Sequence, residues 1–94
     1  MTTNIVTAVV TAYVWSGQLC ANNHYPIAGI TVGVPRSVPL GSAVIINGHR
    51  YIAQDHTAKK YDGRFDIYMK SRTEAIEWGK QTLKVIIYEH TSGY

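Results

Sequence analysis

Short runs of β-branched and aromatic residues alternate along the chain with polar segments that contain Gly, Pro, Asn or Ser. Residues 4–14, NIVTAVVTAYV, have the composition of a strand that is buried on at least one face. Residues 15–29, WSGQLCANNHYPIAG, show no sustained period and predict a long loop. Long loops in small domains often carry function, so this loop is a candidate part of a functional site.

The Asn47-Gly48 dipeptide is the strongest short-range turn signal in the sequence. It predicts a hairpin between residues 42–48 and residues 49–56, both of which contain alternating apolar positions. A short strand is expected before it, at residues 30–34.

A single helix is predicted at residues 71–80, SRTEAIEWGK. Ser71 is placed to cap its start, and Glu74 follows three residues later as in a capping box. A glycine ends the segment. We expect Ile76, alone or with Trp78, to face the core.

Further strands are predicted at residues 63–69 and 82–90, with a turn at 38–41 and a short tail at 91–94. About six short strands with one helix favour a mainly β fold, a small β-barrel, over a layered α/β fold. At 94 residues, the chain is expected to form one domain over residues 1–94.

The composition narrows the classes of partner. The net charge of +3 comes from nine Lys and Arg that are spread along the chain, which predicts no nucleic-acid-binding arm. The same balance suits a polyanionic partner such as a cell wall. The four histidines lack ligand spacing and there is one cysteine, so we expect neither a metal nor another cofactor.

Two features of the sequence bear on the cellular compartment in which the protein acts. Cys20 cannot form an internal disulfide, and it is either a buried structural residue or a nucleophile with a nearby base. Residues 1–15 are apolar but lack both a basic start and a run long enough to span a membrane, so they predict no convincing signal peptide and no membrane span. A protein that acts outside the cytoplasm would then need another delivery route, or would have lost a leader.

Three aspartates lie close together in the segment QDHTAKKYDGRFDIYM. Asp66 is unusual because a carboxylate inside a hydrophobic strand has a raised pKa if it is buried, as a general acid requires. Its alternative is a solvent-facing position paired with Arg64 or Lys70. Asp55 fits either a strand-end turn or a site, and Asp62 fits a turn best.

The run IAQDHTAKKYDGRFDIYM resembles the signature of the three-aspartate (3D) domain family, in which an Asp at a strand end is followed at i+11 by an Asp in a D-[IVL]-[YF] strand. VTAY (10–13), VPLGSAVIING (38–48) and SRTEAIEWGKQTLKVIIYE (71–89) resemble other parts of the family pattern. The resemblance covers most of the chain, and residues 14–30 match least.

This resemblance implies a small six-stranded double-psi β-barrel with one short helix near the C-terminus, similar to the catalytic domain of membrane-bound lytic transglycosylase A and to rare lipoprotein A. It implies that Asp66 is the catalytic acid and Asp55 the second aspartate of the cleft. The implied substrate is the glycan strand of peptidoglycan. One acid would protonate the oxygen between N-acetylmuramic acid and N-acetylglucosamine, then take the proton of the muramoyl 6-hydroxyl as a 1,6-anhydro ring closes.

Candidate substrate-binding residues come from the same resemblance and from the long loop. Thr11 and Tyr13 match a family strand whose hydroxyls line the cleft, although ordinary strand packing explains them as well. Trp15, His24 and Tyr25 lie on or beside the loop, where aromatic rings stack on sugars or form a plain hydrophobic lid.

The sequence departs from the family pattern in two places. Val34 stands where a first aspartate typically precedes the Pro-Leu-Gly turn. DHTAKKYDG replaces the usual D-x-G-G-A-I-K-G loop, so Lys59, Lys60 and Asp62 are candidate substitutes for its binding groups. Either Asp66 suffices, or His24, His56 or Asp62 retunes the site, or the domain binds glycan without cutting it.

Three functions therefore stay open. The first is a lytic transglycosylase that acts at the bacterial cell wall, for example a phage lysin released on lysis. The second is a non-catalytic glycan-binding or phage structural domain, and the third is a hydrolytic glycosidase that uses an aspartate pair. The sequence leaves the oligomeric state open.

Overall fold

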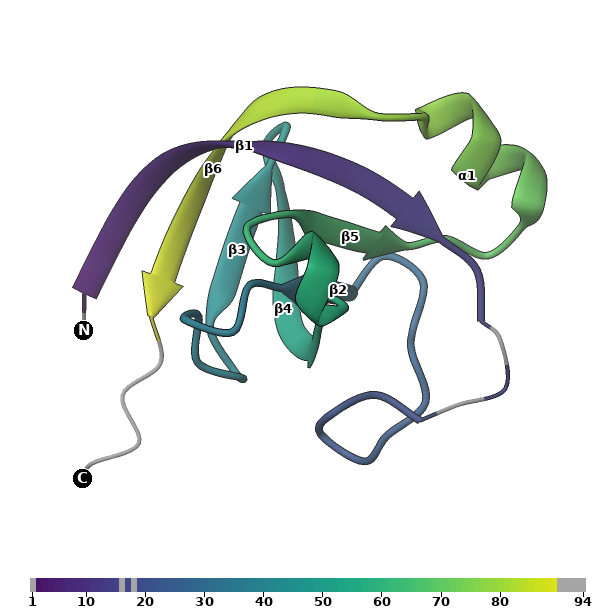
Figure 1. The fold of residues 1–94 in the computed structure, drawn as a ribbon, viewed down its shortest axis with the longest axis horizontal. Coiled ribbons are helices and arrows are strands. Elements are labelled where there is room, and N and C mark those ends of the chain that lie inside the picture. Colours follow the sequence, from purple (N-terminus) through teal and green to yellow (C-terminus); the bar gives the residue numbers. More distant parts are fainter. Residues whose placement is uncertain (1, 16, 18, 90–94) are drawn as a thin grey trace.

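The computed structural model describes residues 2–15, 17 and 19–89. Its six strands form a closed barrel in the order β1-β5-β2-β4-β3-β6 (Figure 1). The strands are β1 (Thr2–Tyr13), β2 (Thr31–Val34), β3 (Ala43–Ile46), β4 (His49–His56), β5 (Phe65–Tyr68) and β6 (Gln81–Glu89). A 3-10 turn, η1, covers Lys59–Tyr61, and the helix α1 covers Arg72–Trp78. The structure confirms the predicted mainly β fold, a small six-stranded barrel with one short helix near the C-terminus.

Two parallel strand pairs lie among the antiparallel ones. β1 pairs with β5 in parallel, as β2 does with β4, whereas β2 and β5 run antiparallel. The register sets Asp66 of β5 opposite Thr11 of β1 on one side and opposite Gly33 of β2 on the other. The central position of β5 between β1 and β2 therefore decides what surrounds Asp66.

The core fills the barrel with branched aliphatic side chains and one phenylalanine. Its fully buried members include Val10, Val32, Val34, Val44, Ile46, Phe65, Ile67 and Val85. In β5, burial alternates with a period of two, so Phe65 and Ile67 enter the core while Asp66 and Tyr68 are only half-buried. Each such apolar side chain contributes about 1.5–3 kcal/mol on burial, which holds the strand that carries Asp66 in place.

The predicted hairpin is present, with its turn at Asn47 and Gly48. Both residues have positive φ, 51° and 76°. This is the backbone of the tight turn whose twist matches that of the flanking strands, and it explains the Asn-Gly signal in the sequence.

The helix α1 has the predicted start and end. Ser71 and Glu74 form a reciprocal capping box, and Gly79 caps the end with a φ of 67°. The expectation that Ile76 faces the core is wrong, because its side chain is 70% exposed. Trp78 packs against the core instead, and its Nε1 donates to the carbonyl of Val10 at 3.1 Å. A helix of fewer than two turns that packs along β1 can direct only one large side chain toward the core, and in α1 this side chain is Trp78.

The ends of the outer strands also differ from the prediction. β1 begins at Thr2, and its first half is largely exposed, with Ile5 at 62%; the expected buried face holds only near Val10. This half pairs with the second half of β6, which also pairs with β3 on its other side, and the two strands run side by side down the left of the view in Figure 1. His90, predicted as the last strand residue, and the tail at 91–94 lie outside the described residues. No helix in the described part of the chain is long and apolar enough to cross a membrane.

Candidate functional site

Asp66 is positioned by the parallel pairing of β1 and β5. The hydroxyl of Thr11 donates to Asp66 Oδ1 at 2.9 Å. Burial raises the pKa of Asp66 above its ordinary value of 3.8, and the nearby Asp55 charge adds to this, while the Thr11 hydrogen bond opposes it. Arg64 and Lys70 both lie in the part of the chain that the structure describes, and neither forms an ion pair with Asp66. Its carboxyl group therefore holds its proton to a higher pH than an exposed aspartate does.

Asp66 lines two hollows. The first has a volume of about 270 Å³, and its lining includes Tyr13, Trp15, Cys20, Asp55, His56 and Asp66. The second has a volume of about 300 Å³, and its lining includes Thr11, Tyr61, Arg64 and Asp66. Thr57 and Ala58 line both. We call them the loop cavity and the Arg64 cavity.

Asp55 lies at the end of β4 and lines the loop cavity with Asp66. Its Oδ1 accepts hydrogen bonds from the backbone N–H groups of His56 and Ala21, each at 2.9 Å. Asp55 therefore fits both interpretations drawn from the sequence, a strand-end turn and a site residue. It accepts the N–H of the next residue, it holds the long loop through Ala21, and its charge raises the pKa of Asp66.

Tyr13 and Cys20 form the inner wall of the loop cavity. The Tyr13 hydroxyl is buried and meets no partner in hydrogen-bonding geometry among the described residues, although the Cys20 thiol is close enough to influence its pKa. Burial raises the pKa of Tyr13 well above its ordinary value. Burial, followed by the Asp55 charge, also raises the pKa of the Cys20 thiol. A thiol that keeps its proton is a poor nucleophile, so the structural interpretation of Cys20 is favoured.

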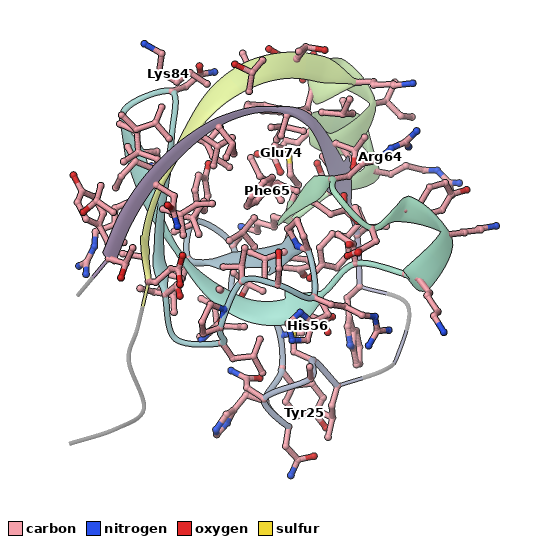
Figure 2. All side chains as sticks on the ribbon, turned by 60° about the vertical axis from the view of Figure 1, so that its left-hand side comes forward. Tyr25, His56, Arg64, Phe65, Glu74 and Lys84 are labelled. Atoms are coloured by element: carbon pink, nitrogen blue, oxygen red, sulfur yellow. The ribbon has the colours of Figure 1, made fainter. Side chains whose placement is uncertain are left out.

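The long loop places its aromatic residues beside this cavity. Trp15 lines the cavity and contacts Tyr25 edge to face, with ring centroids 5.6 Å apart. Tyr25 is 65% exposed, and Figure 2 shows it at the outer end of the loop. His24 is exposed, its backbone N–H donates to Asn22 Oδ1, and its side chain lines neither cavity. Of Trp15, His24 and Tyr25, Trp15 is therefore the one that lines a cavity with Asp66.

Lys60 and Asp62 lie around η1, outside both linings. Lys60 Nζ lies 4.9 Å from the ring centroid of Tyr61. Asp62 Oδ1 accepts the backbone N–H of Arg36 at 2.9 Å, which ties η1 to the turn after β2. This contact fits the turn-forming interpretation of Asp62, and the binding roles of Lys60 and Asp62 stay predictions.

Other lining residues were not assigned a site role from the sequence. Tyr61 and Arg64 line the Arg64 cavity, and Gly33 lines the loop cavity. A Cβ on Gly33 would lie 3.6 Å from the Asp66 carbonyl, so a side chain there would take up space in the loop cavity. No motif marks these positions: Gly33 reaches the site because β2 pairs with β5, and Tyr61 and Arg64 reach it from the connection between β4 and β5.

Position 34 explains one departure from the family pattern. The Val34 side chain is fully buried in the hydrophobic core, and its carbonyl accepts the N–H of Thr57, a residue that lines both cavities, at 3.0 Å. The residue at this position contributes a backbone contact here rather than a carboxylate.

Within the described residues, no group of three His, Cys, Asp or Glu side chains could hold a metal ion.

Comparison with known proteins adds two findings. The family model of the 3D domain matches residues 30–89, which is more than half of the chain and agrees with the resemblance seen in the sequence. The chain is also 28% identical over 95 residues to "Putative cell wall shaping protein YabE" of Bacillus subtilis (strain 168). That match covers 92% of this chain and 23% of the relative, so the chain spans less than a quarter of the relative's length.

Proposed function

Because the chain belongs to the 3D domain family, we propose that it acts on peptidoglycan as a lytic transglycosylase, with Asp66 as both general acid and general base. The observation that carries the proposal is the half-buried Asp66 carboxyl, which has a raised pKa and lies where two cavities meet. The name of the Bacillus subtilis relative supports action at the cell wall. Delivery by a phage stays a prediction from the sequence.

The first step uses the protonated form of Asp66. Its proton passes to the glycosidic oxygen between N-acetylmuramic acid and N-acetylglucosamine as the bond from that oxygen to the muramoyl C1 breaks. Burial and the Asp55 charge both favour the protonated state before this step. An acid whose pKa lies closer to the working pH is the better donor.

The second step uses the carboxylate that remains. Asp66 accepts the proton of the muramoyl 6-hydroxyl, and O6 forms a bond to C1, which gives the 1,6-anhydro ring without a water molecule. The Thr11 hydroxyl, 2.9 Å from Asp66 Oδ1, donates a hydrogen bond that stabilises the carboxylate during this step. One tuned carboxyl group is enough for the cycle.

The contacts of Asp55 favour this mechanism over hydrolysis. A hydrolytic glycosidase generally needs a second carboxylate that activates water or attacks the sugar. Asp55 Oδ1 accepts two backbone N–H groups, one of them from the long loop, so we assign Asp55 to positioning the loop and to raising the pKa of Asp66. The buried Val34 instead favours the second candidate, a domain that binds glycan without cutting it.

Product analysis separates these functions. Purified sacculi are incubated with the protein, and the soluble fragments are identified by mass spectrometry. Anhydro-muropeptides that disappear in Asp66→Asn and persist in Glu77→Gln support the proposal; Glu77 is an exposed residue on α1 outside both cavities. Reducing ends would support hydrolysis instead. Retained binding to sacculi without any product would support the binding domain and contradict both enzymatic functions.

A further inference from the structure

The two cavities that meet at Asp66 differ in charge. The loop cavity contains the Asp55 carboxylate, and Cys20 and Tyr13 on its wall keep their protons. Arg64 lines the other cavity, and its guanidinium lies over Tyr61, which lines the same cavity. An anionic group would be repelled on the first side and attracted on the second, because opposite charges at close range favour one orientation of a ligand.

The Arg64 guanidinium is held in place but leaves its charge available. Its Cζ lies 4.9 Å from the ring centroid of Tyr61, and the backbone N–H of Arg64 donates to the Tyr61 carbonyl at 3.1 Å. Lys60 Nζ is at the same distance from that ring. Arg64 forms no ion pair with any carboxylate among the described residues. A planar guanidinium on an aromatic ring is suited to bind a carboxylate through two parallel hydrogen bonds.

The opposite side offers apolar and aromatic contacts. Trp15 and Leu19 line the loop cavity, and Tyr25 extends the aromatic surface beyond it. Figure 2 shows Tyr25 on the far side of His56 from Arg64, so the aromatic loop and the guanidinium lie apart in the molecule. Sugar rings without charge are the ligands that such a surface accepts.

We propose that the glycan strand crosses Asp66 in one orientation, with a sugar that bears a carboxylate beside Tyr61 and Arg64 and an uncharged sugar beside Tyr13 and Trp15. This inference rests on the proposed function for its substrate. The carboxylate comes either from the lactyl group of the muramoyl residue or from the peptide attached to it.

The test measures binding of disaccharides that contain no bond of the kind the enzyme would cut. Three ligands of equal sugar length are titrated into the isotope-labelled protein by NMR. They are the neutral N-acetylglucosamine dimer, N-acetylglucosaminyl-N-acetylmuramic acid, and the same disaccharide with an Ala-isoglutamine dipeptide. We expect at least one acidic ligand to bind about fivefold or more tightly than the neutral dimer, with the preference shrinking at high salt. A preference for the peptide-free acid identifies the lactyl carboxylate, and a preference limited to the third ligand identifies the peptide carboxylate.

Two variants make the result specific to the cavity. Arg64→Gln should remove the preference for the acidic ligands over the neutral dimer. Arg72→Gln, with the same change of charge at the start of α1, should retain the preference. Equal affinities in the wild type, a preference that survives in Arg64→Gln, or a preference lost in both variants would overturn the inference. A preference without anhydro products from sacculi would contradict the cutting activity alone, and anhydro products without a preference would contradict this inference alone.

Discussion

The interior of β5 and the end of β4 each contribute one aspartate to the same cavity, but the two surroundings differ. Asp66, in β5, is half-buried and accepts a hydrogen bond from a side-chain hydroxyl. Asp55, at the end of β4, accepts two backbone N–H groups, one of which belongs to the long loop. The first environment raises the pKa of a carboxyl group, and the second anchors a chain segment. Two identical side chains thus acquire different roles from what surrounds them.

The largest effect is expected from removing the proton at Asp66. Asp66→Asn keeps the size of the side chain and still accepts the Thr11 hydroxyl, so the fold should be retained. The rate of anhydro-product formation should fall about 10²- to 10⁴-fold, the usual contribution of general acid-base catalysis. Asp55→Asn should cost less than about tenfold, because its oxygen still accepts both N–H groups. Equal losses in the two variants, measured under the same conditions, would make Asp55 a second catalytic group.

A smaller effect is expected from releasing the loop. Asp55→Ala loses both backbone contacts and should lower the free energy of unfolding by about 1–2 kcal/mol. Because Trp15 and Cys20 line the cavity from this loop, activity should also fall, more than in Asp55→Asn. Urea denaturation and product formation are compared for the two variants. Indistinguishable results would mean that the Ala21 contact does not hold the loop.

Thr11→Val tests the surroundings of Asp66, as the Asp55 variants test those of Asp55. It removes the donor that stabilises the Asp66 carboxylate, so the pKa of Asp66 should rise further. The first step needs protonated Asp66, and activity is therefore lost as the pH rises through this pKa. In the variant that loss should move to higher pH, while the maximal rate falls by about tenfold or less. A pH–rate profile measures both quantities. If activity is lost at the same pH in the variant and the wild type, the Thr11 hydrogen bond does not affect the pKa of Asp66.

The smallest effect concerns stability against pH. The pKa of Asp66 is higher in the folded state than its ordinary value of 3.8. Its protonated form therefore favours folding, and this contribution is fully present below the ordinary pKa and is lost as the pH rises through the folded pKa. As the pH rises from the ordinary pKa through the folded pKa of Asp66, the wild type should therefore lose free energy of unfolding relative to Asp66→Asn. Denaturant melts at several pH values measure it, and a change of opposite sign would mean that the Thr11 bond outweighs burial.

Local sequence signals account for much of the fold. The Asn47-Gly48 turn and the Ser71 capping box depend on residues that are close in sequence, and both are confirmed. Helical spacing alone does not choose between Ile76 and Trp78, because the choice depends on what β1 offers at that point.

The site was less accessible to prediction. Its aspartates were found through the resemblance, but the contact between Thr11 and Asp66 joins residues 55 positions apart and exists only through the register of β1 and β5. Arg64 was considered as a partner of Asp66 and instead lies over Tyr61. Alternation along a strand indicates which side chains share a face, and it does not reveal which strand lies next to it.

The place of β1 in the barrel also bears on where this domain can be divided. The family match begins at residue 30, yet β1 lies between β5 and β6 and carries Thr11 and Tyr13. A fragment trimmed to residues 30–89 would turn β5 and β6 into open edge strands with unpaired backbone groups, which are prone to aggregate. It would also lack the hydroxyl that contacts Asp66. Any fragment meant to keep the closed barrel must therefore retain the first strand, even though the match to the family model starts after it.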